Sequence, residues 1–146
     1  MTNVTSKFKD SLKPESFLDF VNYLKSTKNK EECLEVAYNY FINQYHGEKL
    51  KTYTNFLKLF QSDTKKLWLQ KGFMHCTNIN KLFFESLVES GHYKTADIKR
   101  KWTLIWFFSP HQYLRIKIDE SKYMYVDIWA HQFGIKFGDY ARGFHL

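Results

Sequence analysis

Cysteine and proline are scarce in this chain, whose 146 residues contain two of each and only six glycines. Two cysteines, Cys33 and Cys76, cannot build the disulfide network that stabilises many small secreted domains, so we expect both thiols to be free. So few glycines and prolines exclude a low-complexity chain. The length is enough for one domain with a substantial core, and we expect a single domain over residues 1–146.

Long hydrophobic runs are also missing, since no stretch of 18 or more apolar residues occurs. This absence predicts that no helix spans a membrane and that the protein has no membrane partner. The first residues, MTNVTSKFKDSLK, contain no apolar segment of signal-peptide length, and from this we expect a cytoplasmic location. Because no glycine-rich phosphate-binding loop is present either, the sequence predicts no nucleotide, and we expect no cofactor.

Acidic side chains are fewer than basic ones, with 15 Asp and Glu against 22 Lys and Arg and a net charge of +7. Such an excess suits an acidic partner or nucleic acid. The lysines are spread along the chain between acidic residues, however, which is typical of a solvated surface. A basic nucleic-acid-binding domain therefore stays only an alternative. The expected partner is a peptide or protein substrate, and the positive net charge of the chain suggests that this substrate is acidic. The sequence gives no indication of the oligomeric state.

Apolar periodicity predicts helices in the first part of the chain. In PESFLDFVNYLKS, for example, Phe17, Phe20 and Val21 recur at the spacing of an amphipathic helix. We expect helices over 14–26, 29–47 and 53–62, a connector over 65–72, and a central helix from Cys76 to Gly91. Gly47 is expected to end the second of these helices.

After Gly91 the apolar period changes to two, which indicates strands. We expect strands over 102–108, 111–118 and 123–130, a turn over 119–122, and an ordered loop over 131–146. Helices followed by an antiparallel sheet are typical of an α+β fold. The helical part is expected to cover about 14–91 and the sheet part about 102–146.

Cys76, His111 and Asp127 form a candidate catalytic group. A thiol at a helix start is favoured as the reactive thiolate, above all beside an imidazolium. His111 would act as base and acid, while the Asp127 carboxylate would hold the imidazole in the useful tautomer. In HQYLRIKI and YMYVDIW, pairing the apolar faces brings odd residues opposite odd residues. The histidine and the aspartate then become direct or diagonal neighbours on one face.

Other interpretations of these residues stay open. Cys76 can be an inert buried thiol, His111 can merely begin a strand, and Asp127 can lie at a strand edge. We expect Cys33, on the apolar side of its helix, to be a packing residue. A metal site could draw on six histidines and two cysteines, but neither an H-x3-H pair nor C-x2-C spacing occurs, so no metal is expected.

The order of these residues resembles the transglutaminase-like core of the papain-like cysteine enzymes. The shared features are Gly-x3-Cys from Gly72 to Cys76 at a helix start, a glycine at the end of that helix, a histidine opening a strand, and Val-Asp followed by a tryptophan. The resemblance covers about residues 68–130. It implies a papain-like, transglutaminase-like fold in which Cys76 is the nucleophile, His111 the base and acid, and Asp127 the orienting carboxylate.

The resemblance also implies a function, namely a cysteine-dependent acyl-transfer enzyme with a thioester intermediate, as in cysteine peptidases, amidases and acyltransferases. His75 and Thr77 stand where animal transglutaminases carry Gln and Trp, and 146 residues leave no room for their calcium sites and extra β-domains. We therefore expect hydrolysis of an amide or peptide bond rather than protein crosslinking. The alternative from another class is a catalytically inactive copy of the fold that serves as a protein-binding module.

The oxyanion hole is the least defined part of this hypothesis. The backbone N–H of Cys76, at a helix start, is the expected first donor. A side chain upstream is expected to supply the second, and the candidates are Gln70, Trp68 and His75.

Overall fold

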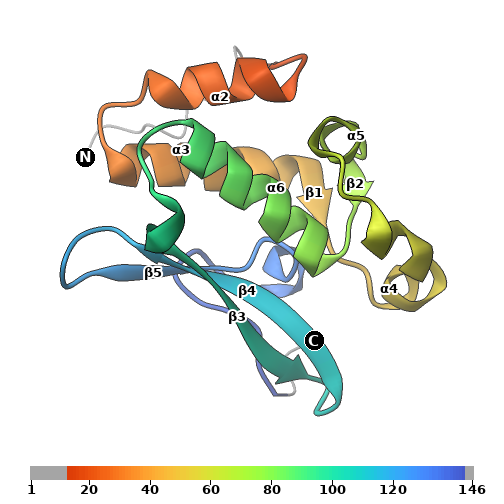
Figure 1. The fold of residues 1–146 in the computed structure, drawn as a ribbon. Coiled ribbons are helices and arrows are strands. Elements are labelled where there is room, and N and C mark those ends of the chain that lie inside the picture. Colours follow the sequence, from red (N-terminus) through yellow and green to blue (C-terminus); the bar gives the residue numbers. More distant parts are fainter. Residues whose placement is uncertain (1–12, 144–146) are drawn as a thin grey trace.

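Helices form one layer of the molecule and a twisted three-stranded sheet lies beneath them (Figure 1). The computed structural model describes residues 13–143, so the expectation about the first twelve residues lies outside the described part. The α-helices are α2 (Phe17–Lys25), α3 (Lys30–Gln44), α4 (Lys49–Thr54), α5 (Thr64–Leu69) and α6 (Cys76–Glu89). Three short 3-10 helices are η1 (Phe56–Phe60), η2 (Thr95–Asp97) and η3 (His131–Phe133). Between residues 13 and 143, no helix has the length and apolar character needed to cross a membrane.

The main sheet is antiparallel, in the order β3–β4–β5. Its strands are β3 (Ile98–Ile105), β4 (Ser109–Lys117) and β5 (Tyr123–Val126). Leu114 pairs with Val126 and Arg115 with Tyr125, so even residues pair with even and odd with odd, as the alternation predicts. A second sheet joins two parallel strands, β1 (Tyr45–His46) and β2 (Gly72–Phe73). Helices and small sheets together make the α+β class that the sequence predicts.

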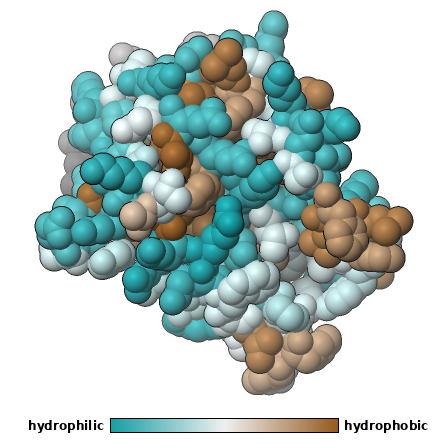
Figure 2. Space-filling model, in the orientation of Figure 1, coloured by the Kyte–Doolittle hydropathy of each residue, from teal (hydrophilic) through white to brown (hydrophobic). Residues whose placement is uncertain are grey.

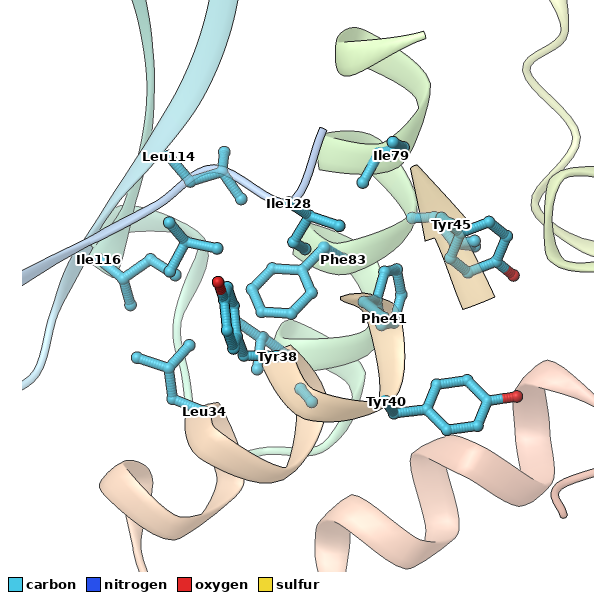
Figure 3. Close-up of a cluster of buried hydrophobic side chains, with 14 of the residues drawn as sticks. Leu34, Tyr38, Tyr40, Phe41, Tyr45, Ile79, Phe83, Leu114, Ile116 and Ile128 are labelled. Atoms are coloured by element: carbon cyan, nitrogen blue, oxygen red, sulfur yellow. The ribbon is translucent and has the colours of Figure 1, made fainter. Parts of the chain in front are cut away.

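The core lies between the helices and the sheet. Phe41 of α3 meets Phe83 of α6 edge to face, with ring centroids 5.0 Å apart. Figure 3 shows these rings next to Leu114, Ile116 and Ile128 from the sheet side. All five side chains are fully buried. Helices and strands therefore share one hydrophobic cluster, and α6, at its centre, is held from both sides.

Side-chain caps explain where the first helices begin. The Ser16 side chain accepts a hydrogen bond from the Asp19 N–H, and the Asp19 carboxylate accepts one from the Ser16 N–H, which together form a capping box. At α3 the Asn29 side chain accepts from the Glu32 N–H. Such caps satisfy amides that have no partner inside the helix.

Residues 49–72 depart from the prediction. The segment expected as a connector contains helix α5, because Asp63 caps it and its apolar side chains Leu67 and Trp68 are buried against the core. The helix expected over 53–62 is instead the end of α4 followed by η1. Every residue of α4 and η1 is exposed or half-buried, so packing imposes no single helical register there.

Strand boundaries near the hairpin also differ from the expected ones. β3 begins at Ile98 and not at 102, since the basic residues of IKRK lie on an exposed edge strand, where lysine is common. The expected strand over 102–108 ends early, because Trp106 (φ 51°) and Phe107 (φ 64°) adopt the left-handed conformation in the turn to β4. The helix expected to end at Gly47 ends at Gln44, because the following residues form β1.

The tail after β5 crosses the sheet from one edge to the other. The Gly138 N–H donates to Tyr125 O over 3.0 Å, and the Gly143 N–H donates to Leu104 O over 2.9 Å. Between these two points the Tyr140 ring stacks on Tyr113, with centroids 3.9 Å apart. The tail is therefore fixed to all three strands by backbone bonds and one aromatic stack.

Candidate active site

Cys76 is the first residue of α6. The chain reaches it from β2, and the Met74 N–H donates to His46 O over 3.1 Å, which fixes the approach. The first intrahelical hydrogen bonds run from the N–H groups of Asn78 and Ile79 to His75 O. The N–H groups of Cys76 and Thr77 come before them, so the helix leaves both amides free to bind another acceptor. Cys76 is half-buried and is one of the residues that line a pocket.

His111 and Asp127 form a buried pair. Nε2 of His111 lies 2.7 Å from Oδ2 of Asp127, and each side chain is only 1% exposed. The strand expected over 123–130 ends at Val126, so Asp127 lies directly after β5 and past its last pair with β4. The predicted contact between Asp127 and His111 is nevertheless present.

Two backbone amides complete the environment of the Asp127 carboxylate. Oδ1 accepts from the Ala130 N–H over 3.2 Å, and Oδ2 accepts from the Ala141 N–H over 3.0 Å. Ala130 lies in the loop after β5, immediately before η3, whereas Ala141 belongs to the tail that crosses the sheet. Three donors from separate segments thus hold one buried carboxylate in place, which offsets the loss of its hydration.

The Cys76 sulfur acts on the same imidazole. Burial of the His111 ring opposes protonation, but the hydrogen bond and charge of Asp127, with a further contribution from the nearby Cys76 sulfur, raise the pKa of His111 to about 9. Because Nε2 is taken by Asp127, Nδ1 is the nitrogen left for the sulfur. The three residues therefore form a chain of contacts from sulfur to imidazole to carboxylate, with a ring that is protonated at neutral pH.

Trp129 fixes the position of the imidazole. Its ring centroid lies 5.1 Å from that of His111, and it is almost completely buried. Its backbone O accepts from the Gly47 N–H over 3.0 Å. A Cβ added at Gly47 would overlap the Trp129 ring, so only glycine fits there without displacing the indole.

A pocket of about 430 Å³ opens at Cys76. Three groups of residues line it around the sulfur. The segment of α4 and η1 contributes Thr52, Tyr53, Phe56 and Leu59. The β3–β4 hairpin contributes Trp102, Ile105, Trp106, Ser109 and Pro110. His75, Cys76, Thr77, His111 and Trp129 complete the lining. A substrate group in this pocket would contact both the sulfur and the histidine.

The structure does not bring Trp68 or Gln70 to this pocket. Trp68 stacks on Tyr40 and lines a different cavity with Glu89, the last residue of α6. A helix of 14 residues is about 20 Å long, so Trp68 lies toward the opposite end of α6 from Cys76. Gln70 follows the last residue of α5 and is not among the residues that line the pocket. Packing of α5 against the core thus removes Trp68 as an oxyanion donor.

His75 does reach the pocket, but with the wrong hydrogen-bonding form. Its Nε2 lies 3.1 Å from Thr52 O, and because a carbonyl can only accept, Nε2 carries the proton. Burial lowers the pKa of His75, which keeps the ring neutral at pH 7. Nδ1 then has no proton, and it is buried without a partner in the described part of the chain. His75 therefore has no N–H to offer an oxyanion, whereas the backbone of Thr77 does.

Cys33 and the histidines show no second chemical centre. Cys33 is fully buried, as expected, with its sulfur 3.6 Å from the Ser90 hydroxyl oxygen, and burial raises the pKa of its thiol. Among residues 13–143, no group of three or more His, Cys, Asp and Glu side chains is placed to hold a metal ion. His145 lies outside the described residues.

Comparison with known proteins gives no match to this chain, whether with models of protein families, curated proteins or solved structures. The site is therefore interpreted from its own geometry. The sequence pattern included Trp129 as the tryptophan that follows Val-Asp, but it gave this residue no role beside the imidazole. The Ala141 amide was missed altogether. Ala141 acts through its backbone N–H, which leaves no signal in the side chain.

Replacing Asp127 by Asn is expected to lower the pKa of His111 from about 9 to its ordinary value of about 6.5 or less, because burial then lacks a carboxylate to oppose it. NMR titration of the ring measures this shift.

The raised pKa of His111 stabilises the folded wild type fully below pH of about 6.5, and this contribution disappears as the pH rises through about 9. Over that window the free energy of unfolding should fall by on the order of 3 kcal/mol in the wild type and much less in D127N. A ring that still titrates near 9 in D127N would contradict the assignment.

Gly47→Ala is expected to reduce the free energy of unfolding by about 1–3 kcal/mol, because the added methyl group displaces the Trp129 ring. The His111 NMR signals should shift as well, since that indole packs on the imidazole. Gly91→Ala is the matched control. It meets no atom within 4 Å and carries only the strain of its φ of +81°, about 1–2 kcal/mol. Unchanged His111 signals in G47A would refute the role of Gly47.

Proposed function

We propose that the protein is a cysteine-dependent acyl-transfer enzyme with a transglutaminase-like fold of the papain-like type, and that it hydrolyses amide or peptide bonds. One observation carries the proposal: a buried imidazole bonded through Nε2 to a carboxylate lines the same pocket as a helix-start cysteine, whose sulfur contributes to the raised pKa of that imidazole. A cysteine that only packs in the core does not require a histidine of this kind next to it. A His–Asp pair with only a structural role would not explain why a half-buried cysteine lines the same pocket.

The first half of the reaction forms a thioester. The raised pKa of His111 favours its imidazolium form, and the nucleophile is the thiolate form of Cys76, since the thiolate is the reactive form of a cysteine. The sulfur attacks the amide carbonyl carbon, and a C–S bond forms while the carbonyl π electrons move to oxygen. When the tetrahedral intermediate collapses, the C–N bond breaks, and His111 gives its proton to the departing amine.

The second half releases the acid. His111, now neutral, removes a proton from water, and the resulting hydroxide attacks the thioester carbonyl. The C–S bond breaks, the thiolate returns, and the imidazole keeps the proton for the next cycle. Asp127 keeps Nε2 engaged throughout, so that Nδ1 faces the reaction.

The backbone N–H groups of Cys76 and Thr77 serve as the oxyanion donors in this proposal. Both precede the first intrahelical bond of α6, and the positive end of the helix dipole adds to their effect. This assignment replaces the side-chain donors expected upstream, since His75 has its N–H engaged with Thr52. No amine-binding group is needed, because water completes the reaction.

Iodoacetamide labelling at pH 6.5 tests the proposal. Cys76 should react on the order of tenfold or more faster than a free cysteine peptide, because an ordinary thiol is almost wholly protonated at that pH. Mass spectrometry of the tryptic peptides gives the rates for Cys76 and Cys33 separately. His111→Ala should remove the advantage of Cys76, and Asp127→Asn should reduce it.

His92→Ala is the matched control for the loss of a histidine. His92 contacts Thr27 and does not line the pocket, so labelling of Cys76 should not change. An activated ester should also leave an acyl group on Cys76 that mass spectrometry detects in the wild type but not in the Cys76→Ser variant. Equal and slow labelling of both cysteines would contradict the enzyme and leave a binding module.

A further inference from the structure

The pocket at Cys76 has apolar walls contributed by two distant parts of the chain. Tyr53, Phe56 and Leu59 come from α4 and η1 on one side. Trp102, Ile105 and Trp106 come from the β3–β4 hairpin on the other. Figure 2 shows an apolar patch in the place of α4 and η1 and another at the tip of the hairpin. The reacting sulfur therefore lies between two apolar surfaces.

Formal charge is absent from this wall. Of the described residues that line the pocket, none is Asp, Glu, Lys or Arg. The positive charge of His111 is already paired with Asp127 and directed at the sulfur. A charged group between these walls would lose its water, which is costly where no lining side chain pairs with it. Lys49, which is not a lining residue, has its Nζ 5.5 Å from the centroid of the Trp106 ring. The net charge of the chain, which suggested an acidic substrate, thus has no counterpart among the residues that line the pocket.

Two large rings stand at the rim with much of their surface in water. Phe56 is 55% exposed and Trp102 is 58% exposed. Covering such rings with an apolar group removes apolar surface from water on both sides, which favours binding in proportion to the area. An apolar ligand thus gains most where these two rings meet it.

The turn of the β3–β4 hairpin, which forms part of this wall, contains two residues with a strained backbone conformation. Trp106 and Phe107 have positive φ values of 51° and 64°, a conformation in which Gly and Asn are common and bulky residues are rare. Side chains with a Cβ are strained in this conformation. Trp106 lines the pocket, so the strained residue is one that a ligand would contact.

We infer that the substrate carries a large apolar, uncharged group next to its scissile carbonyl, and that this pocket binds it. The inference rests on the proposed function. The volume of about 430 Å³ exceeds that of the roughly 150 Å³ cavity that holds one benzene, so the pocket accommodates about two aromatic rings. The preferred substrates are therefore peptides or amides with aromatic or bulky aliphatic groups at this position.

Three alkylating reagents test this inference. N-methyl- and N-benzyl-iodoacetamide are neutral, and N-(4-carboxybenzyl)-iodoacetamide carries a carboxylate. In each, the Cys76 sulfur displaces iodide from the methylene carbon; a C–S bond forms, the C–I bond breaks, and iodide leaves. Rates at Cys76 are divided by the rate of the same reagent with glutathione. The benzyl reagent should react on the order of tenfold faster than the methyl one, and the carboxylate on its far end should remove most of that advantage.

Phe56→Ala and Trp102→Ala should each reduce the benzyl advantage several-fold, since each removes a ring from the rim. Tyr123→Ala is the control, because Tyr123 is an exposed ring (46%) at the other end of the sheet. Circular dichroism checks that each variant folds. Equal corrected rates for all three reagents, with labelling still dependent on His111, would overturn the inference and leave the proposed function intact. If Cys76 reacts no faster than Cys33 with any reagent, the proposed function itself fails.

Discussion

The buried pair of His111 and Asp127 is the interaction on which the rest of this structure depends. Removing two opposite charges from water costs several kcal/mol for each ion, and attraction between them compensates only if the remaining lone pairs are also satisfied. Here the carboxylate accepts three N–H groups, from β4, from the loop after β5 and from the tail. Each of these segments is placed by its own packing, so the pair exists only when all of them are in position.

Gly47 connects this pair to the helical layer. It lies between β1 and α4, and its N–H binds the backbone of Trp129 while its missing side chain leaves room for the indole. The Gln132 side chain in turn donates to Gly47 O. Through these contacts the strand that carries the imidazole and the segment that forms one wall of the pocket keep a fixed relation. The start of α6, between them, then presents the sulfur to both.

Much of this arrangement was predictable from local patterns. Alternation in two strands established which residues share a face, and this was enough to bring His111 and Asp127 together. The start of the central helix at Cys76 followed from its apolar stripe and from Gly91. Both predictions depend on the period of buried side chains, which the core enforces.

The sequence did not predict the features that depend on tertiary packing and that leave little or no pattern in the types of side chain. The Ala141 amide is a backbone group, and any residue but proline would supply it. The basic start of β3 has the composition of a solvated segment, because an edge strand is solvated. Trp68 was a candidate oxyanion donor because it lies a few residues upstream of Cys76. The packing of α5 instead buries its side chain in the core. Oxyanion donors and pocket walls depend on such tertiary placement, and local rules do not reach it.

The hydrogen bond from Ala141 to Asp127 also has a consequence for biosynthesis. Residues that carry the thiol and the imidazole leave the ribosome well before the segment that crosses the sheet. Until that segment is released and docks on the strands, the carboxylate lacks one of its three donors, and the nascent chain holds a cysteine without its finished relay. The surroundings of the buried carboxylate are thereby completed only after residue 141 has been synthesised and has docked on the sheet.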